Sequence, residues 1–163
     1  MIRVLLAAAL VLALAGCKGK DDQVQTRAPK DATAAVEALQ QRLVTGLGGV
    51  TAVKGADTDT VPCEGKGGEV AKDGRYYVLG AYQFEMPMSE HVAALGRLRD
   101  ALAADGWEIT EFRPLTSGGG ALIARNPADG FGFSLTTAGT KTSIGALITS
   151  ACYHPPSRDM VNF

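Results

Sequence analysis

The chain has 163 residues, with 16 basic and 17 acidic side chains and a formal net charge of −1. This balance argues against a nucleic-acid-binding protein, which needs a strongly basic face, and against broad electrostatic adsorption to anionic lipid. Twenty glycines and a charged fraction of 20% fit a compact globular domain with many turns rather than a disordered chain.

The N-terminus predicts an export signal over residues 1–16. This segment has a positive charge at Arg3, an apolar run from Val4 to Ala15 and small residues at its end, the pattern of a secretory signal peptide that is removed. The run has about a dozen residues, whereas a helix needs roughly 20 to span a bilayer. Removal of the leader leaves 147 residues, the usual size of one domain.

Cys17 follows directly after this leader. The stretch Leu14-Ala15-Gly16-Cys17 resembles the lipobox of bacterial lipoproteins, in which the leader is cut before the cysteine and the cysteine thiol carries diacylglycerol. The resemblance implies lipidation of Cys17, with acyl chains such as palmitate, and a location at the extracytoplasmic face of the cell membrane. The alternative is an ordinary secreted protein with a coincidental cysteine. Residues 17–30 are polar and of mixed charge, so we expect a lipid anchor and a flexible tether there.

Two further cysteines, Cys63 and Cys152, are expected to form a disulfide. An even number of remaining cysteines in an exported domain favours a structural bridge. The alternatives are a metal pair, for which the CxxC spacing is missing, and a nucleophile, which needs a histidine base beside it.

Residues 31–153 are expected to form a single α+β domain that begins with a helix. Apolar residues recur at helical spacing up to Leu47, and a glycine-rich stretch follows. Asp31 or Thr33 can cap the start of this helix. A short β-like stretch is expected to follow it at residues 50–54, and residues 55–74, rich in Gly, Asp, Thr and charge, are expected to form a long loop.

The sequence of the second half of the domain predicts one helix between β-strands. Arg75–Phe84 has high β propensity, and Ser89 is the expected N-cap of a helix that ends at Asp105. Short connections between the later strands favour an antiparallel meander. The four later strands are expected at residues 107–113, 121–125, 131–137 and 143–152. Two helices and about five main strands predict a two-layer sandwich, with a mostly antiparallel sheet and both helices on one face. The C-terminal tail, residues 154–163, is expected to be extended.

Four short motifs support a family resemblance. They are Thr60-Val-Pro-Cys63-Glu-Gly-Lys-Gly-Gly68, Asp105-Gly-Trp107-Glu-Ile109, Asp129-Gly-Phe131 and Thr149-Ser-Ala-Cys152-Tyr153. Together they resemble small actinobacterial lipoproteins, including the LppA-type family. The family offers no agreed activity, so the resemblance implies a location, a disulfide and a fold, and it transfers no catalytic residue.

The titratable residues predict no catalytic centre. The only two histidines are expected to be exposed, His91 as a solvated or capping side chain in the first turn of the second helix and His154 in the tail. They form no zinc-binding spacing, and no GxSxG nucleophile motif occurs. Asp57 and Asp59 lack the EF-hand pattern, and we expect neither a metal nor a cofactor.

The leading hypothesis is a non-enzymatic, lipid-anchored cell-envelope protein that acts as a binding or interaction module. Its partners would be the membrane, through the N-terminal lipid, and an unidentified envelope protein or small ligand, with no nucleic acid. One alternative is an envelope hydrolase that uses Glu108, Glu111 or Asp129, which a cleft with two facing carboxylates would favour. Another is a carrier of a small apolar ligand, which would need a cavity between the helices and the sheet.

Overall fold

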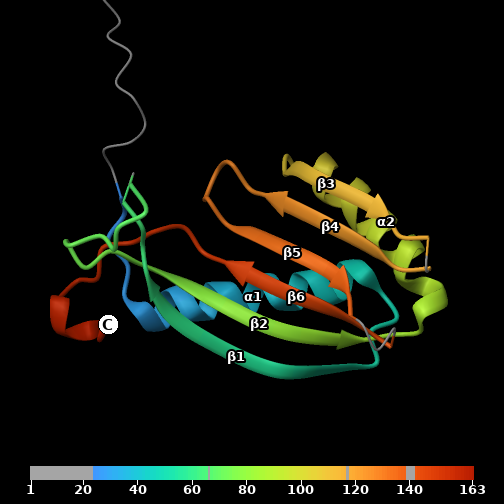
Figure 1. The fold of residues 1–163 in the computed structure, drawn as a ribbon, viewed down its shortest axis with the longest axis horizontal. Helices are drawn as coiled ribbons and strands as arrows, with labels where there is room; N and C mark the ends of the chain where they lie inside the picture. The colour runs from blue at the N-terminus through green and yellow to red at the C-terminus, as the bar shows by residue number, and fades with distance from the viewer. Residues whose placement is uncertain (1–23, 66, 117, 139–141) are drawn as a thin grey trace, which may run out of the picture.

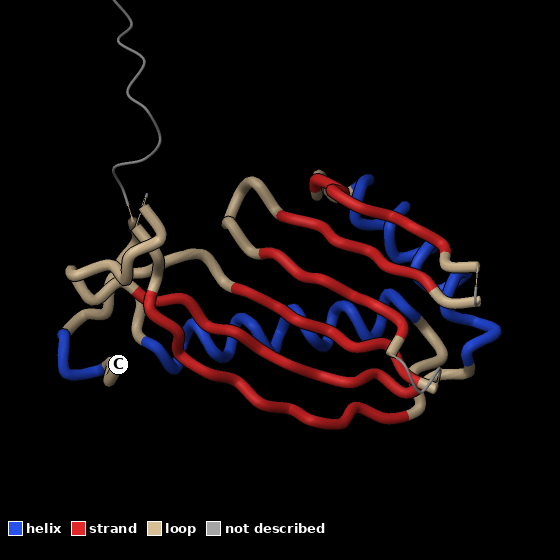
Figure 2. Tube along the Cα trace, in the orientation of Figure 1, coloured by secondary structure: helices blue, strands red, loops and turns tan. Residues whose placement is uncertain are grey.

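A computed structural model describes residues 24–65, 67–116, 118–138 and 142–163. The expected signal peptide, residues 1–16, and the expected lipidation site, Cys17, lie outside the described residues. The expected α+β sandwich is confirmed: the helices α1 (Pro29–Leu47) and α2 (Met88–Ala104) cover one face of an antiparallel sheet (Figures 1 and 2).

The sheet has six strands, one more than expected. They are β1 (Ala52–Pro62), β2 (Tyr76–Glu85), β3 (Glu108–Pro114), β4 (Gly120–Arg125), β5 (Gly132–Thr137) and β6 (Ser143–Thr149). Their order across the sheet is β1-β2-β6-β5-β4-β3, and every neighbouring pair is antiparallel. The last four strands form the expected meander, and β6 returns beside β2 in the centre of the sheet.

The extra strand, β1, occupies much of the segment that was expected to be a loop. It pairs with β2 from Ala52 opposite Glu85 to Pro62 opposite Tyr76. Most of its side chains are exposed because it is an edge strand, so its sequence lacks the apolar alternation that marks a strand. A bulge interrupts the register after Lys54, where Gly55 takes a φ of 60° that favours glycine.

Both helices begin differently from expectation. Pro29 opens α1, two residues before Asp31, because proline fits the first turn of a helix, where its missing N–H has no partner to lose. At α2 the expected cap Ser89 lies inside the helix. Pro87 holds the N-cap position, and no side chain caps this end by a hydrogen bond. The Pro87 carbonyl instead accepts a hydrogen bond from the Glu90 amide at 2.9 Å.

The hydrophobic core lies between the helices and the covered face of the sheet. In β2 the even-numbered residues from Tyr76 to Phe84 are buried, while the odd-numbered ones face away from the helices and are more accessible. Gly80 allows α1 to approach β2, since a Cβ there would lie 2.8 Å from Val36 Cγ1. Residues from all parts of the fold share this core, among them Val36, Leu43, Phe84, Leu95, Leu102, Leu122, Leu135, Ile144 and Ile148.

The two ends of the described chain are held together at one end of the sheet. A disulfide joins Cys63 to Cys152, as predicted, and the next residue, Tyr153, pairs with Tyr76. Thr26 forms a parallel bridge with His154, so residues of the expected tether are paired with the chain terminus. The expected extended tail also contains a 3-10 turn, Arg158–Met160.

Replacing both Cys63 and Cys152 with serine should lower the free energy of unfolding by about 4 to 5 kcal/mol. The bridge spans a sequence separation of 89, and the chain entropy that it removes from the unfolded state grows with loop length. Urea denaturation monitored by circular dichroism measures the change, and reduction of the unmodified protein should reproduce it. An unchanged midpoint in both experiments would contradict a stabilising bridge.

Candidate functional site

The face of the sheet opposite the helices has no covering layer among the described residues. Side chains on this uncovered face come from alternate positions of each strand, such as Leu79 and Ala81 on β2, Leu147 on β6 and Ser134 on β5. These residues are only partly buried or exposed, whereas their chain neighbours pack against the helices. The uncovered face is therefore a surface available for a partner.

The strand register arranges this face in rows that are charged at the edges and neutral in the centre. One row starts at Asp57 on β1, ends at Glu111 on β3 and has four uncharged residues between them. The two neighbouring rows also have charged residues on the edge strands β1 and β3. Their central residues are uncharged, with the exception of Arg125 on β4. The central residues of the three rows are Ala81, Leu147, Ser134 and Ile123; Gln83, Gly145, Thr136 and Ala121; and Leu79, Thr149 and Gly132. We call these central residues the neutral band.

Two adjoining hollows lie along the neutral band. One, of about 510 Å³, is lined by residues of β2, β5 and β6 and by Gly55 at the β1 bulge. The other, of about 540 Å³, continues over β4 and β5, where Arg125 is its single charged lining residue. Ser134 and Leu147 border both hollows, so the two form one continuous surface.

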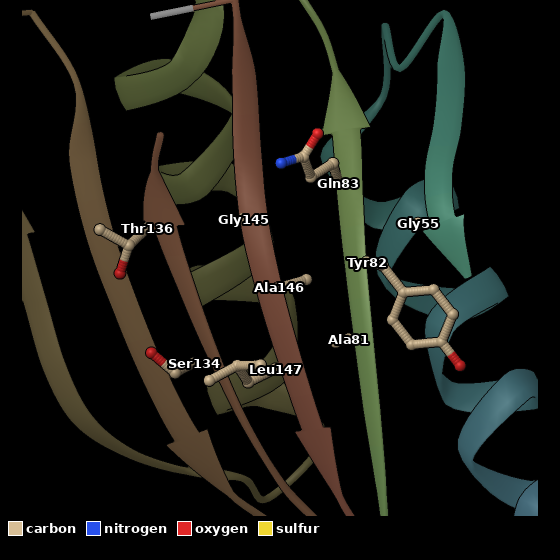
Figure 3. Close-up of a pocket in the computed structure, with 9 residues that line it drawn as sticks. All are labelled: Gly55, Ala81, Tyr82, Gln83, Ser134, Thr136, Gly145, Ala146 and Leu147. Atoms are coloured by element: carbon tan, nitrogen blue, oxygen red, sulfur yellow. The ribbon is translucent and has the colours of Figure 1, made fainter. Parts of the chain in front are cut away.

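Leu147 is the most prominent apolar side chain of this surface. It is 51% exposed, although it lies on a central strand between β2 and β5. Figure 3 shows its side chain extending toward Ser134 on the neighbouring strand, with Thr136 and Gln83 nearby on the same surface. A half-exposed leucine among hydroxyl and amide groups can give a partner both an apolar contact and hydrogen bonds.

Tyr82 borders the first hollow, but its ring belongs to the core. The residue is 5% exposed and its ring stacks on Phe84, with centroids 6.3 Å apart. Burial raises the pKa of the Tyr82 hydroxyl, and the nearby carboxylate of Glu37 adds to the shift. The hydroxyl has no hydrogen-bond partner within the described part of the chain.

The three carboxylates considered for hydrolysis are not assembled as a pair. Glu108 lies opposite Arg125 in the β3–β4 register, and Glu111 forms an ion pair with Arg113 at 3.0 Å. Asp129 lies in the turn before β5, where its Oδ1 accepts a hydrogen bond from the Phe131 amide at 3.0 Å. Glu111 and Asp129 thus each have a local structural contact, and none of the three carboxylates lines the two hollows of the uncovered face.

His91 was expected to be exposed, and this expectation is wrong. Its side chain is fully buried, with Nε2 3.1 Å from the Met86 carbonyl and Nδ1 3.1 Å from Thr137 Oγ1. Because a carbonyl only accepts, this arrangement assigns the proton to Nε2 and leaves Nδ1 to accept from the threonine hydroxyl. Thr137 Oγ1 in turn accepts from the Gly120 amide at 2.9 Å. The histidine therefore ties the start of α2 to β4 and β5.

The second histidine, His154, and the two aspartates of the expected loop, Asp57 and Asp59, take no part in a cluster of titratable side chains able to hold a metal among the described residues. His154 is half-buried and uses its backbone to pair with Gln25 and Arg27. Asp57 and Asp59 are exposed on the edge strand β1. No group of three His, Cys, Asp or Glu side chains able to hold a metal occurs in residues 24–163 outside the gaps.

A third hollow, of about 360 Å³, lies at the margin between α1 and the sheet. Its lining combines apolar side chains of α1 with Trp107 and Phe131, and it includes two arginines. The guanidinium of Arg42 lies 5.8 Å from the centroid of the Trp107 ring and forms an ion pair with Asp105 at 2.6 Å. This hollow is the feature that a small-ligand carrier would use.

Comparisons of the chain with protein-family models, curated proteins and solved structures return no match.

The exposure of the Leu147 side chain can be tested by stability measurements without a partner. Leu147→Thr should change the free energy of unfolding by about 0.5 kcal/mol or less, because the side chain is half-exposed. Ile148→Thr, the same new residue one position later, should cost about 2 to 4 kcal/mol, because Ile148 is fully buried. Urea denaturation of both variants gives the comparison. Equal losses would show that Leu147 belongs to the core.

Proposed function

We propose that the protein is a non-enzymatic, lipid-anchored protein of the cell envelope, and that its uncovered sheet face binds a partner. The observation that carries the binding role is the neutral band, a continuous surface with a half-exposed Leu147 on a central strand. A lone exposed apolar residue needs no explanation, but here it lies between two adjoining hollows of about 510 and 540 Å³.

The anchoring part of the proposal draws on three features. The stretch before Cys17 resembles a lipobox, residues 18–23 are polar, and the other two cysteines form a disulfide suited to an oxidising compartment. In addition, no helix among the described residues is long and apolar enough to cross a membrane. The proposal attaches the protein to the membrane through a lipid on Cys17.

The chemistry of the neutral band indicates what the partner presents. Leu79, Leu147 and Ile123 offer apolar contacts, while Ser134, Thr136, Thr149 and Gln83 offer donors and acceptors. Charged residues of β1 and β3 border the band and can set the orientation of a partner. We infer an uncharged, partly apolar segment of an envelope protein as the partner.

A carrier role is the second candidate, and the hollow beside Trp107 favours it. Its volume of about 360 Å³ suits a small molecule, and Leu39, Trp107 and Phe131 supply an apolar lining. The aspartate and two arginines that share this lining would contact a polar end of the ligand. A hydrolase receives less support, because Glu111 and Asp129 already have local structural contacts.

The anchor is tested by replacing Cys17 with serine. We expect metabolic labelling with a palmitate analogue to be lost and the protein to move from the membrane fraction to the soluble fraction. The unmodified chain, processed in parallel, provides the control. A Cys17→Ser protein that remains in the membrane fraction would contradict the lipid anchor.

The binding surface is tested by photo-crosslinking in intact cells. A photoactivatable residue at position 147 should yield a discrete adduct with a protein partner, whereas the same residue at Ala104, exposed on α2, should not. If the Ala104 position gives the same adduct, or if position 147 gives none, the uncovered face is not the binding surface. A small-molecule adduct at position 147 instead of a protein adduct would contradict a protein partner on this face.

A further inference from the structure

Exposed apolar side chains gather at the end of the molecule where the described chain begins. Among the described residues, five large apolar side chains are exposed, and three of them belong to two segments at this end. Val70, in the loop after Cys63, is 56% exposed, and Met160 and Phe163, in the C-terminal tail, are 51% and 55% exposed. We call these three residues the tail cluster.

The two segments of the tail cluster are fixed to each other. Arg158 donates a hydrogen bond from Nη2 to the Lys72 carbonyl at 2.6 Å. Val70 and Phe163 also border a common hollow of about 230 Å³. Val70 and Phe163 therefore border one surface made from the loop and the tail, and Met160 belongs to the same tail segment.

This surface lies beside the entry of the N-terminal segment. The Arg27 amide donates to the His154 carbonyl at 2.9 Å, and the His154 amide donates to the Gln25 carbonyl at 3.0 Å. The hydroxyl of Tyr76 donates to the Arg27 carbonyl at 2.7 Å, and burial raises the pKa of Tyr76 to about 12. Figure 1 shows the first described residues, the loop before β2 and the C-terminus at the same end.

The chain between the expected anchor and this entry is short. Val24 follows Cys17 by seven residues, which span at most about 25 Å when fully extended. A lipid on Cys17 would thus hold residues 24–27 close to the bilayer, and a local concentration this high strengthens otherwise weak contacts. The end that carries the tail cluster is the end that such a tether brings to the membrane.

We propose that the tail cluster rests in the headgroup region of a phospholipid bilayer and orients the domain on the membrane. This inference rests on the lipid anchor proposed above. Valine, methionine and phenylalanine side chains gain from insertion at the boundary of headgroups and acyl chains. The neighbouring charges balance, with Lys72 and Arg158 beside Asp73 and Asp159, so the contact depends on apolar insertion rather than on basic charge.

The opposite end of the molecule offers a matched control. Val53, near the start of β1, is 40% exposed, and the nine residues to Pro62 at the far end of that strand span about 30 Å. A tryptophan at position 163 or at position 53 would replace an exposed apolar residue in both cases. The single natural tryptophan, Trp107, is 6% exposed and gives a common background signal.

The test couples the chain from Cys17 onward to vesicles through that thiol, which is the only free one because Cys63 and Cys152 are bridged. This chain contains all described residues of the fold. The vesicles contain phosphatidylcholine and phosphatidylglycerol with brominated acyl chains and a trace of maleimide-bearing phosphatidylethanolamine. Tryptophan emission is compared with that on vesicles without bromine.

The emission of the new tryptophan is the emission above the Trp107 background. We expect bromine to reduce this emission about twofold or more in Phe163→Trp and to leave it unchanged in Val53→Trp. No quenching of Phe163→Trp, or equal quenching of both variants, would overturn the inference. Because the maleimide replaces the natural lipid, this result is independent of cellular lipidation. A failure of the anchor would instead be seen as membrane retention of the Cys17→Ser protein in cells.

Discussion

The antiparallel pairing of β2 with β6 is the contact on which the rest of the fold depends. It joins Leu79–Glu85 to Ser143–Thr149 and thereby unites the β1–β2 hairpin with the β3–β6 meander in one sheet. A pairing between segments so far apart in the sequence must offset a large loss of chain entropy. The disulfide between Cys63 and Cys152 acts at the same junction, because it links the segment before β2 to the segment after β6. The covalent bond and the strand pairing therefore reinforce each other.

One consequence of this topology is a separation between stability and recognition. Both helices pack on the same face, so the buried alternate residues of the strands carry the core while the other set stays accessible. The two edge strands, β1 and β3, hold most of the charged residues of the uncovered face, and the four central strands supply the neutral band. Changes at the band, such as at Leu147, can alter binding without loss of the core. The tail cluster lies at the disulfide-linked end, where it would contact the membrane beside the tether.

The sequence predicted those elements that depend on residues close together in the chain. The apolar stripe of α1 and the short turns of the meander follow from residue spacing, and the even number of remaining cysteines predicted the disulfide. Only the start of the edge strand β1 was expected, and the rest was missed because its exposed polar residues resemble a loop until β2 lies beside them. His91 was misplaced because its burial depends on Met86 and Thr137, which the fold brings to it. The neutral band could not be predicted, since its rows exist only once the strand order is known.

The central claim is that the uncovered sheet face is occupied by a partner in the envelope. Hydroxyl-radical footprinting of intact cells against the purified protein tests it most directly, because it reports side-chain accessibility without a substitution. The account predicts that Leu147, 51% exposed in the structure, is oxidised in the purified protein and protected in cells, while Val53 is oxidised equally in both. Equal oxidation of Leu147 in cells and in the purified protein would contradict the claim.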